Sequence, residues 1–195
     1  METVLLPALI PAVDDPSARG LADFDAVVHF HRPGIFRFIL ASLRDHDAAE
    51  TLTQECFLRA YRARTGFRGD AMVKTWLMRI AVNLVRDHLS SERLKFWRRT
   101  QRSSVDLSVA QTWLADGRSS PEDEATAKQR VAAVWAAVNE LPEGQRTVFL
   151  LRFVEEMDIL EIAAATGLKE GTVKIHLFRG LRTVRAKVGQ SPKEA

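Results

Sequence analysis

Cationic and hydrogen-bonding side chains are concentrated between positions 172 and 182, on or near the side of a predicted helix that faces away from its buried residues. They are Thr172, Lys174, His176, Arg179 and Arg182. Lysine and arginine bind phosphates, and in a major groove they also donate hydrogen bonds to guanine. These residue types on one side of a helix predict contact with duplex DNA. The alternative interpretation is a helical hairpin whose basic face is only solvated.

The elements that would position these side chains form a helix-turn-helix pattern between Ile159 and Arg185. Ile159, Ile162 and Ala163 are expected on the buried face of the first helix, and Gly167 permits a sharp turn. The additional apolar surface of Ile159-Leu160 is expected in the core, with a partner helix as the alternative. The second helix has apolar residues at three- and four-residue steps, and its N-terminal half would enter the groove. Its expected buried residues are Val173, Leu177, Leu181 and Val184.

No group of residues in the sequence predicts catalysis or metal binding. Asp45, His46 and Asp47 are adjacent, but neighbours at the start of a helix do not converge on one substrate atom, so we interpret them as a helix entry. Cys56 is the single cysteine, which fits a reducing compartment. We therefore expect no catalytic residue, no metal and no cofactor.

The charge of the chain is small overall but unevenly distributed. The sequence has 195 residues, with 28 lysines and arginines against 25 acidic residues and a formal charge of +3. Basic residues concentrate at 86–102 and 169–188, with an acidic stretch between them. Two basic surfaces favour a polyanionic partner, although each patch alone is also typical of a solvated helix face.

Helical periodicity dominates the sequence, and no alternating pattern indicates a strand. We predict an all-α fold of two small helical domains. The first three helices are expected at 21–43, with a break at Pro33-Gly34, at about 49–61 and at about 71–89. The second should bury Ala49, Leu52, Thr53, Cys56, Phe57, Ala60 and Tyr61. Further helices are expected from Pro121, capped by Ser120, to about Leu141 and from Pro142 onward, with two short helices completing the chain.

These helices divide the chain into five segments. Residues 1–20 are expected to be a flexible leader, 21–102 the first domain, 103–120 a flexible linker, 121–189 the second domain and 190–195 a tail. The apolar stretch at 4–11 contains two prolines. It is shorter than the ~20 residues of a membrane-spanning helix. We expect no membrane insertion and a cytoplasmic location.

Several motifs in a fixed order resemble the extracytoplasmic-function (ECF) sigma factors of bacterial RNA polymerase, within the sigma-70 family. They are AAETLTQECFLRAY at 48–61, FRGD at 67–70, TWLMRIAVN at 75–83, LPE at 141–143 and EGTVK at 170–174. The resemblance implies a sigma-two and a sigma-four domain. It also implies a subunit that directs core polymerase to promoters and assists their melting, in a stress or envelope response. Nucleotidyl transfer would belong to core polymerase, so this chain would not be an enzyme.

The resemblance also implies a role for each surface of the first domain. Core polymerase would bind Glu50, Leu52, Gln54, Glu55 and Arg59. Phe67 and Asn83 would hold an unstacked base of the minus-ten element, because an aromatic ring stacks on a base and a carboxamide bonds to its edge. Lys74, Arg79 and Arg86 would hold nearby phosphates.

In the second domain, the resemblance assigns the minus-thirty-five element to Thr172, Lys174, His176, Arg179 and Arg182. Four residues of this helix differ from those frequent in the family, so its preferred bases are expected to differ. Ile175, His176, Gly180 and Leu181 stand where serine, arginine, alanine and arginine are frequent. An anti-sigma factor covering both domains is a further partner that the resemblance implies.

Two other classes of protein are alternatives to this interpretation. A free-standing helix-turn-helix regulator would bind an operator as a dimer, and operator binding without polymerase would favour it. The block at 67–83 and the absence of an evident ligand pocket argue against it. A small nuclease or hydrolase lacks a supporting group of residues.

Overall fold

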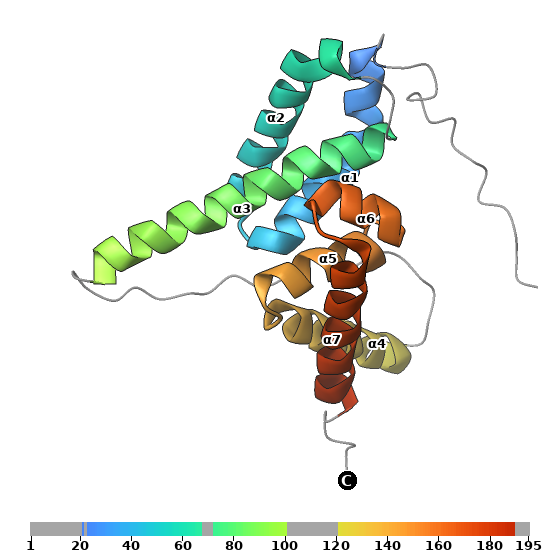
Figure 1. Ribbon diagram of the computed structural model, residues 1–195. Coiled ribbons are helices and arrows are strands. Elements are labelled where there is room, and N and C mark those ends of the chain that lie inside the picture. The colour runs from blue at the N-terminus through green and yellow to red at the C-terminus, as the bar shows by residue number, and fades with distance from the viewer. Residues whose placement is uncertain (1–20, 22, 68–71, 101–120, 190–195) are drawn as a thin grey trace, which may run out of the picture.

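The computed structural model describes residues 21, 23–67, 72–100 and 121–189, without the side chains of 93–100, 121–128 and 130 (Figure 1). This described part of the chain contains seven α-helices, one 3-10 helix and no strand, which confirms the all-α prediction. The expected leader at 1–20, linker at 103–120, tail at 190–195 and cap at Ser120 lie outside the described residues.

Helix α1 spans Phe24–Leu43 and begins where the Asp23 carboxylate accepts a hydrogen bond from the backbone N–H of Ala26 at 3.0 Å. The predicted break at Pro33-Gly34 is wrong, because α1 continues through both residues. Buried apolar residues on both sides of the proline hold the helix in place, and this packing outweighs the hydrogen bond that proline removes. They include Val27, Ile35, Phe38 and Ile39.

Helix α2 spans His46–Ala63, and the Asp45 carboxylate accepts a hydrogen bond from Ala48 N–H at 3.0 Å. Asp45 is therefore a helix cap, as the sequence indicated. The prediction that Tyr61 is buried is wrong, since this side chain is 47% exposed. The ring lies edge-on to Phe24 and carries the Arg64 guanidinium 3.5 Å above its centroid, so neighbours cover only part of it.

The 3-10 helix η2 spans Arg64–Gly66, and helix α3 spans Val73–Thr100. Helix α3 continues well beyond the predicted end near Leu89. The apolar stripe used for the prediction ends there, but helix-forming residues such as Glu92, Leu94 and Lys95 follow it.

The second half of the chain contains α4 (Pro121–Asn139), α5 (Glu143–Phe153), α6 (Ile159–Thr166) and α7 (Glu170–Gly189). Asp158 and Glu161 form a reciprocal capping box at the start of α6, and Gly167 ends it at φ 74, a conformation that favours glycine. Helices α6 and α7 are the expected helix-turn-helix, although α7 has 20 residues and is not short. Leu160, expected in the core, is 63% exposed because α6 turns this position away from its neighbours.

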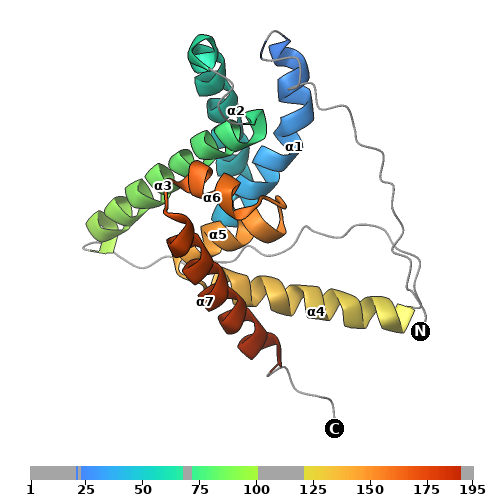
Figure 2. The ribbon, with the colours of Figure 1, turned by 45° about the vertical axis from the view of Figure 1, so that its right-hand side comes forward.

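The two halves of the chain pack against each other in the structure. Figures 1 and 2 show α1, α2 and α3 as one group, with α6 lying against α3 and α5 close to α1. Buried apolar residues of both groups belong to one continuous cluster. Within the described residues, no helix is long and apolar enough to span a membrane.

Candidate nucleic-acid interface

One side of α3 carries three of the five residues expected to hold the minus-ten element, Arg79, Asn83 and Arg86, together with Trp76. Trp76, Arg79, Asn83 and Arg86 follow one another at three- and four-residue steps, so they share one face of the helix. Arg79, Asn83 and Arg86 are exposed, and Trp76 is half-buried. A carboxamide flanked by two guanidinium groups can bind a base edge and its neighbouring phosphates.

An aromatic pair lies at the N-terminal end of this face. The ring centroids of Phe67 and Trp76 are 5.0 Å apart, and the ring planes are inclined by 43°. Both rings pack partly against the core while remaining half-exposed. Each ring offers an apolar face on which a base can stack, and the exposed Asn83 lies about two turns along α3 from Trp76 on the same side of the helix.

Lys74 lies elsewhere on α3, separated from Asn83 by about 180° around the helix axis. Its ammonium donates a hydrogen bond to the backbone carbonyl of Glu155 at 2.5 Å. Arg86 also reaches the second half of the chain, where its Nη2 donates to the carbonyl of Thr166 at 3.4 Å. Two of the three expected phosphate ligands therefore contact the protein itself.

The exposed face of α7 carries Lys174, Arg179 and Arg182, as expected for a helix that reads duplex DNA. Thr172 is half-buried near the start of the helix. Lys174 lies 4.0 Å from the Glu170 carboxylate, one turn earlier. Because both side chains are well exposed, this ion pair is weak and leaves Lys174 available to a phosphate.

His176 has a different environment from the other expected contacts of α7. Its half-buried ring lies against α5, so a Cβ added at Gly144 would come within 2.9 Å of His176 Cε1. Its Nδ1 is buried and has no hydrogen-bond partner among the described residues. The structure therefore separates His176 from the exposed cations.

The residues expected to bind core polymerase lie along α2. Gln54 and Arg59 are exposed, whereas Glu50, Leu52 and Glu55 are half-buried. Three of these residues, Glu50, Glu55 and Arg59, already have ionic partners in the structure. Glu50 accepts from Arg32 at 2.6 Å, and Glu55 accepts from Arg59 at 2.7 Å.

Exposed apolar residues on the same helices escaped the sequence analysis. Leu58 is 43% exposed on α2, and Phe178 is 67% exposed on α7 beside Ile175. The three-residue step from Ile175 to Phe178 places both on one side of α7. The signal that could have revealed them is their position between exposed charged residues, outside the buried stripe.

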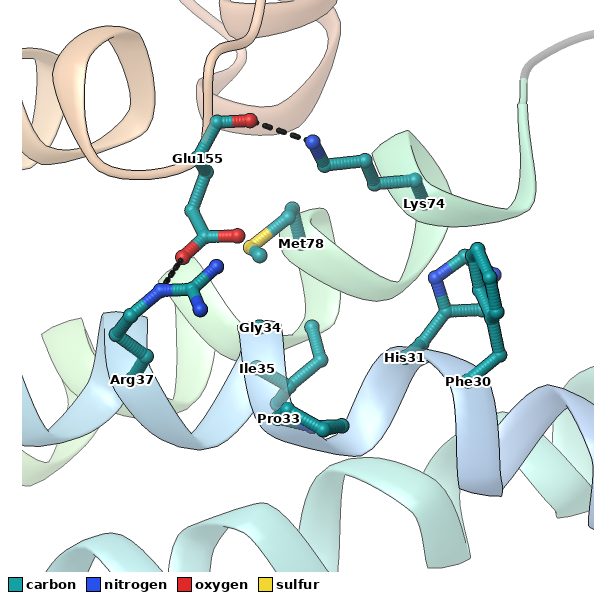
Figure 3. Close-up of a pocket in the computed structure, with 9 residues that line it drawn as sticks. All are labelled: Phe30, His31, Pro33, Gly34, Ile35, Arg37, Lys74, Met78 and Glu155. Atoms are coloured by element: carbon teal, nitrogen blue, oxygen red, sulfur yellow. Dashed lines mark hydrogen bonds and ion pairs between the residues drawn. The ribbon is translucent and has the colours of Figure 1, made fainter. Parts of the chain in front are cut away.

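Glu155, at the end of α5, was also missed. It is 3% exposed and lies between α1 and α3, where its Oε1 accepts a hydrogen bond from Arg37 Nε at 3.0 Å (Figure 3). A cavity of about 270 Å³ adjoins it, lined by residues of α1 and α3 that include Phe30, His31 and Met78. No local pattern marks Glu155, because its burial arises only when the two halves of the chain meet.

The electrostatics of Glu155 follow from that burial. Desolvation raises the pKa of its carboxyl, while the hydrogen bond and charge of Arg37 and the charge of Lys74 lower it in part. The ionised carboxylate is therefore costly at this position even with cations beside it.

The fold and its exposed faces define a two-part helical protein with a helix-turn-helix. Two family descriptions match the chain: "Sigma-70 region 2" at residues 27–104 and "Sigma-70, region 4" at residues 132–184. The matches fall on the helices that carry the expected minus-ten and minus-thirty-five residues.

Curated relatives extend the match over most of the chain. The RNA polymerase sigma-H factor of Pseudomonas aeruginosa is 32% identical, over 83% of both chains. The ECF RNA polymerase sigma-E factor of Escherichia coli K12 is 34% identical, over 70% of this chain and 72% of the relative. The ECF RNA polymerase sigma factor SigW of Bacillus subtilis is 28% identical, over 83% and 87%.

Two solved structures share the fold. The sigma factor RpoE, crystallised with the anti-sigma factor NepR from Bartonella quintana, gives a TM-score of 0.66 at 23% identity, over 87% of this chain and 99% of that one. CnrH, in complex with the cytosolic domain of CnrY, gives 0.60 at 19% identity, over 88% and 92%.

This chain belongs to the ECF group of the sigma-70 family. It is a DNA-binding subunit that directs RNA polymerase to promoters for transcription initiation.

Proposed function

We propose that the chain divides promoter recognition between two domains, at 21–102 and 121–189. The face formed by Trp76, Arg79, Asn83 and Arg86, with Phe67 against Trp76, takes an unstacked base and its phosphates from the minus-ten strand. The observation that carries this assignment is the exposed carboxamide of Asn83 on the same side of α3 as Trp76, which forms a half-exposed aromatic pair with Phe67. Base extrusion costs a few kcal/mol, which stacking and edge hydrogen bonds offset.

The second domain reads the minus-thirty-five duplex through α7. Lys174, Arg179 and Arg182 bind phosphates or guanine edges, Thr172 contributes at the start of the helix, and His176 assists from the side. The exposed cations of α7 support this role. In the first domain, α2 docks on core polymerase through Glu50, Leu52, Gln54, Glu55 and Arg59, with the exposed Leu58 adding apolar contact.

The remaining assignments follow from membership of the family. The chain performs no bond chemistry of its own, because nucleotidyl transfer belongs to core polymerase. It works in the cytoplasm, within a stress or envelope response, and an anti-sigma factor restrains it. The sigma factor RpoE, which shares the fold and was crystallised with the anti-sigma factor NepR, supports the last point.

The test is transcription from pooled genomic fragments by purified core polymerase, with and without this protein. New start sites that share paired upstream sequences are expected. Asn83→Ala should abolish those starts, whereas the exposed control Ser91→Ala on the same helix should keep them. If a known sigma factor activates the same core but this chain yields no starts and binds duplex DNA alone, the free-standing regulator replaces the sigma-factor proposal.

A further inference from the structure

Two large apolar side chains lie on the exposed face of α7, among the residues that the proposed function assigns to duplex DNA. Ile175 is 50% exposed and Phe178 is 67% exposed, although the same helix has a buried side. Apolar residues scattered singly over a surface are common, whereas neighbouring ones indicate a contact with a partner. The roles assigned so far to the cations of α7 leave this apolar pair without a function.

The buried side of α7 fixes the direction of both side chains. Gly180 and Val184 are buried, and α7 packs against α4 and α5 (Figure 2). Around the helix axis, Ile175 lies about 180° from Val184, and Phe178 lies about 160° from Gly180. Both side chains therefore point away from the other helices of the second domain, as the base-reading residues of a recognition helix do.

Cations surround the apolar pair. Arg179 and Arg182 follow Ile175 at steps of four and seven residues, so they share its side of the helix, and both are exposed. The whole of α7 contains five basic residues and one acid. An apolar protein segment seated on the pair would offer these cations no anion, whereas duplex DNA borders its base edges with phosphates. Charge complementarity therefore favours duplex DNA as the partner of this surface.

The chemistry of the two side chains limits what they can recognise. Isoleucine and phenylalanine have no polar side-chain atom, so neither can form a hydrogen bond with a base edge. In the major groove the bases present donors and acceptors, and the methyl group of thymine is the apolar feature of that pattern. An apolar side chain over any other base edge would cover donors or acceptors without pairing them, which is costly. Apolar residues at the centre of the reading face therefore favour thymine.

We propose that Ile175 and Phe178 recognise the methyl groups of two thymines in the minus-thirty-five element. The proposal rests on the proposed function, because it requires α7 to enter the major groove of that element. The two residues are separated by about 4.5 Å along the helix axis, and successive base pairs by about 3.4 Å, so the thymines belong to neighbouring base pairs. Position 175 is one of those at which α7 departs from the residues frequent in the family, so this preference is a property of this chain.

The test removes single methyl groups from the DNA. Holoenzyme, assembled from core polymerase and the full chain, first selects its preferred duplexes from a library of random sequence. Each thymine of the selected minus-thirty-five element is then replaced by deoxyuridine, which keeps the base pair and lacks only the methyl group. Holoenzyme binding to the fluorescein-labelled duplex is measured by anisotropy. Two neighbouring replacements should each weaken binding about fourfold, the factor that corresponds to burial of one CH₂ group. Replacement of thymines outside both promoter elements is the control and should have no effect.

Variants of α7 assign each methyl group to a side chain. Ile175→Ser should remove the effect of deoxyuridine at one of the two base pairs, and Phe178→Ser should remove it at the other. Both positions are exposed, and serine has a helix propensity similar to that of isoleucine and phenylalanine, so α7 is not weakened. Val131→Ser is the matched control, because it removes a side chain that is 45% exposed on α4. This variant should keep both methyl effects.

Binding that depends on no thymine methyl of the element, or a methyl effect that persists in both serine variants, would overturn the proposal. Serine variants that keep the affinity for DNA and lose affinity for core polymerase would also overturn it, because the apolar pair would then contact protein. Failure of the proposed function gives a different result. Wild-type holoenzyme would then enrich no duplex and yield no promoter-specific transcripts, which overturns both proposals. A chain that supports those transcripts without any methyl effect retains its function and lacks only the recognition of thymine.

Discussion

A Cβ on Gly34 would lie 2.9 Å from Oε2 of Glu155, closer than side chains normally approach, so the carboxylate fits only because position 34 is a glycine. Glu155 is buried, and its other oxygen is bonded to Arg37, so it has little freedom to move aside. The ion pair and the glycine thus form one structural unit across the two halves of the chain.

The Glu155 carboxyl should make stability depend on pH. Its pKa is raised in the folded protein, so the folded state binds this proton more tightly than the unfolded state. The contribution to the free energy of unfolding is therefore largest below the ordinary pKa of 4.5 and falls as pH rises through the raised value. In urea titrations, the free energy of unfolding of the wild type should therefore fall relative to that of Glu155→Gln as the pH rises through this range. If the wild type instead became more stable relative to Glu155→Gln as the pH rises, the raised pKa of Glu155 would be contradicted.

Gly180→Ala should stabilise the second domain. The added Cβ would meet Leu141 Cδ1 at 3.6 Å and Phe149 Cδ2 at 3.7 Å, which are ordinary contacts, and alanine favours a helix interior over glycine. The expected gain is about 0.5–1 kcal/mol in the free energy of unfolding, measured by urea denaturation. Gly144→Ala is the matched control, because its added Cβ would lie 2.9 Å from His176 Cε1. This variant should gain less free energy of unfolding than Gly180→Ala, or lose some. Destabilisation by Gly180→Ala would show that α7 packs more tightly than this structure indicates.

The thiol of Cys56 should be unreactive in the native protein. Burial raises its pKa to about 12, and the side chain is fully buried between α2 and α3, where its Sγ lies 3.6 Å from the Leu77 carbonyl. A disulfide reagent at mildly alkaline pH should modify it only at the rate of unfolding, because the reactive thiolate is scarce. An exposed engineered cysteine such as Ala186→Cys provides the control. Equal rates for the two thiols would mean that the first domain opens readily.

Arg179 and His176 should differ in what they contribute to α7. Arg179→Ala is expected to weaken binding to the minus-thirty-five duplex by about 1–3 kcal/mol, because the guanidinium is exposed on the proposed reading face. His176→Ala removes a half-buried ring of α7 that packs against α5. The variant should therefore lower the free energy of unfolding by about 1 kcal/mol, and it should weaken DNA binding less than Arg179→Ala does. Fluorescence anisotropy and urea denaturation measure the two effects. The reverse order would place His176 on the DNA-facing side of the helix.

Local sequence predicted much of the fold. The buried stripe of α2, the Asp45 cap and the turn at Gly167 depend on neighbours within one or two helical turns, so their signals lie in short stretches of sequence. The motif order was enough to indicate the family, because each motif lies within one helix or loop. The exposed cations of α7 also followed from periodicity alone.

Where periodicity failed, the cause was contact between distant segments. The continuity of α1 through Pro33 depends on buried residues that face α2 and α3. The same holds for the half-buried setting of His176, which depends on α5. A helical pattern gives the relative angle of two side chains but not which neighbour each one meets.

The sequence by itself determined the helices, the helix-turn-helix and the membership of the sigma-70 family. Only the tertiary structure decided that Lys74 and Arg86 contact the second half of the chain and that Glu155 is buried against Arg37. The physical reason is that helix formation is set by interactions a few residues apart. The partners of these charged groups lie about eighty or more residues away and meet them only when the two halves pack.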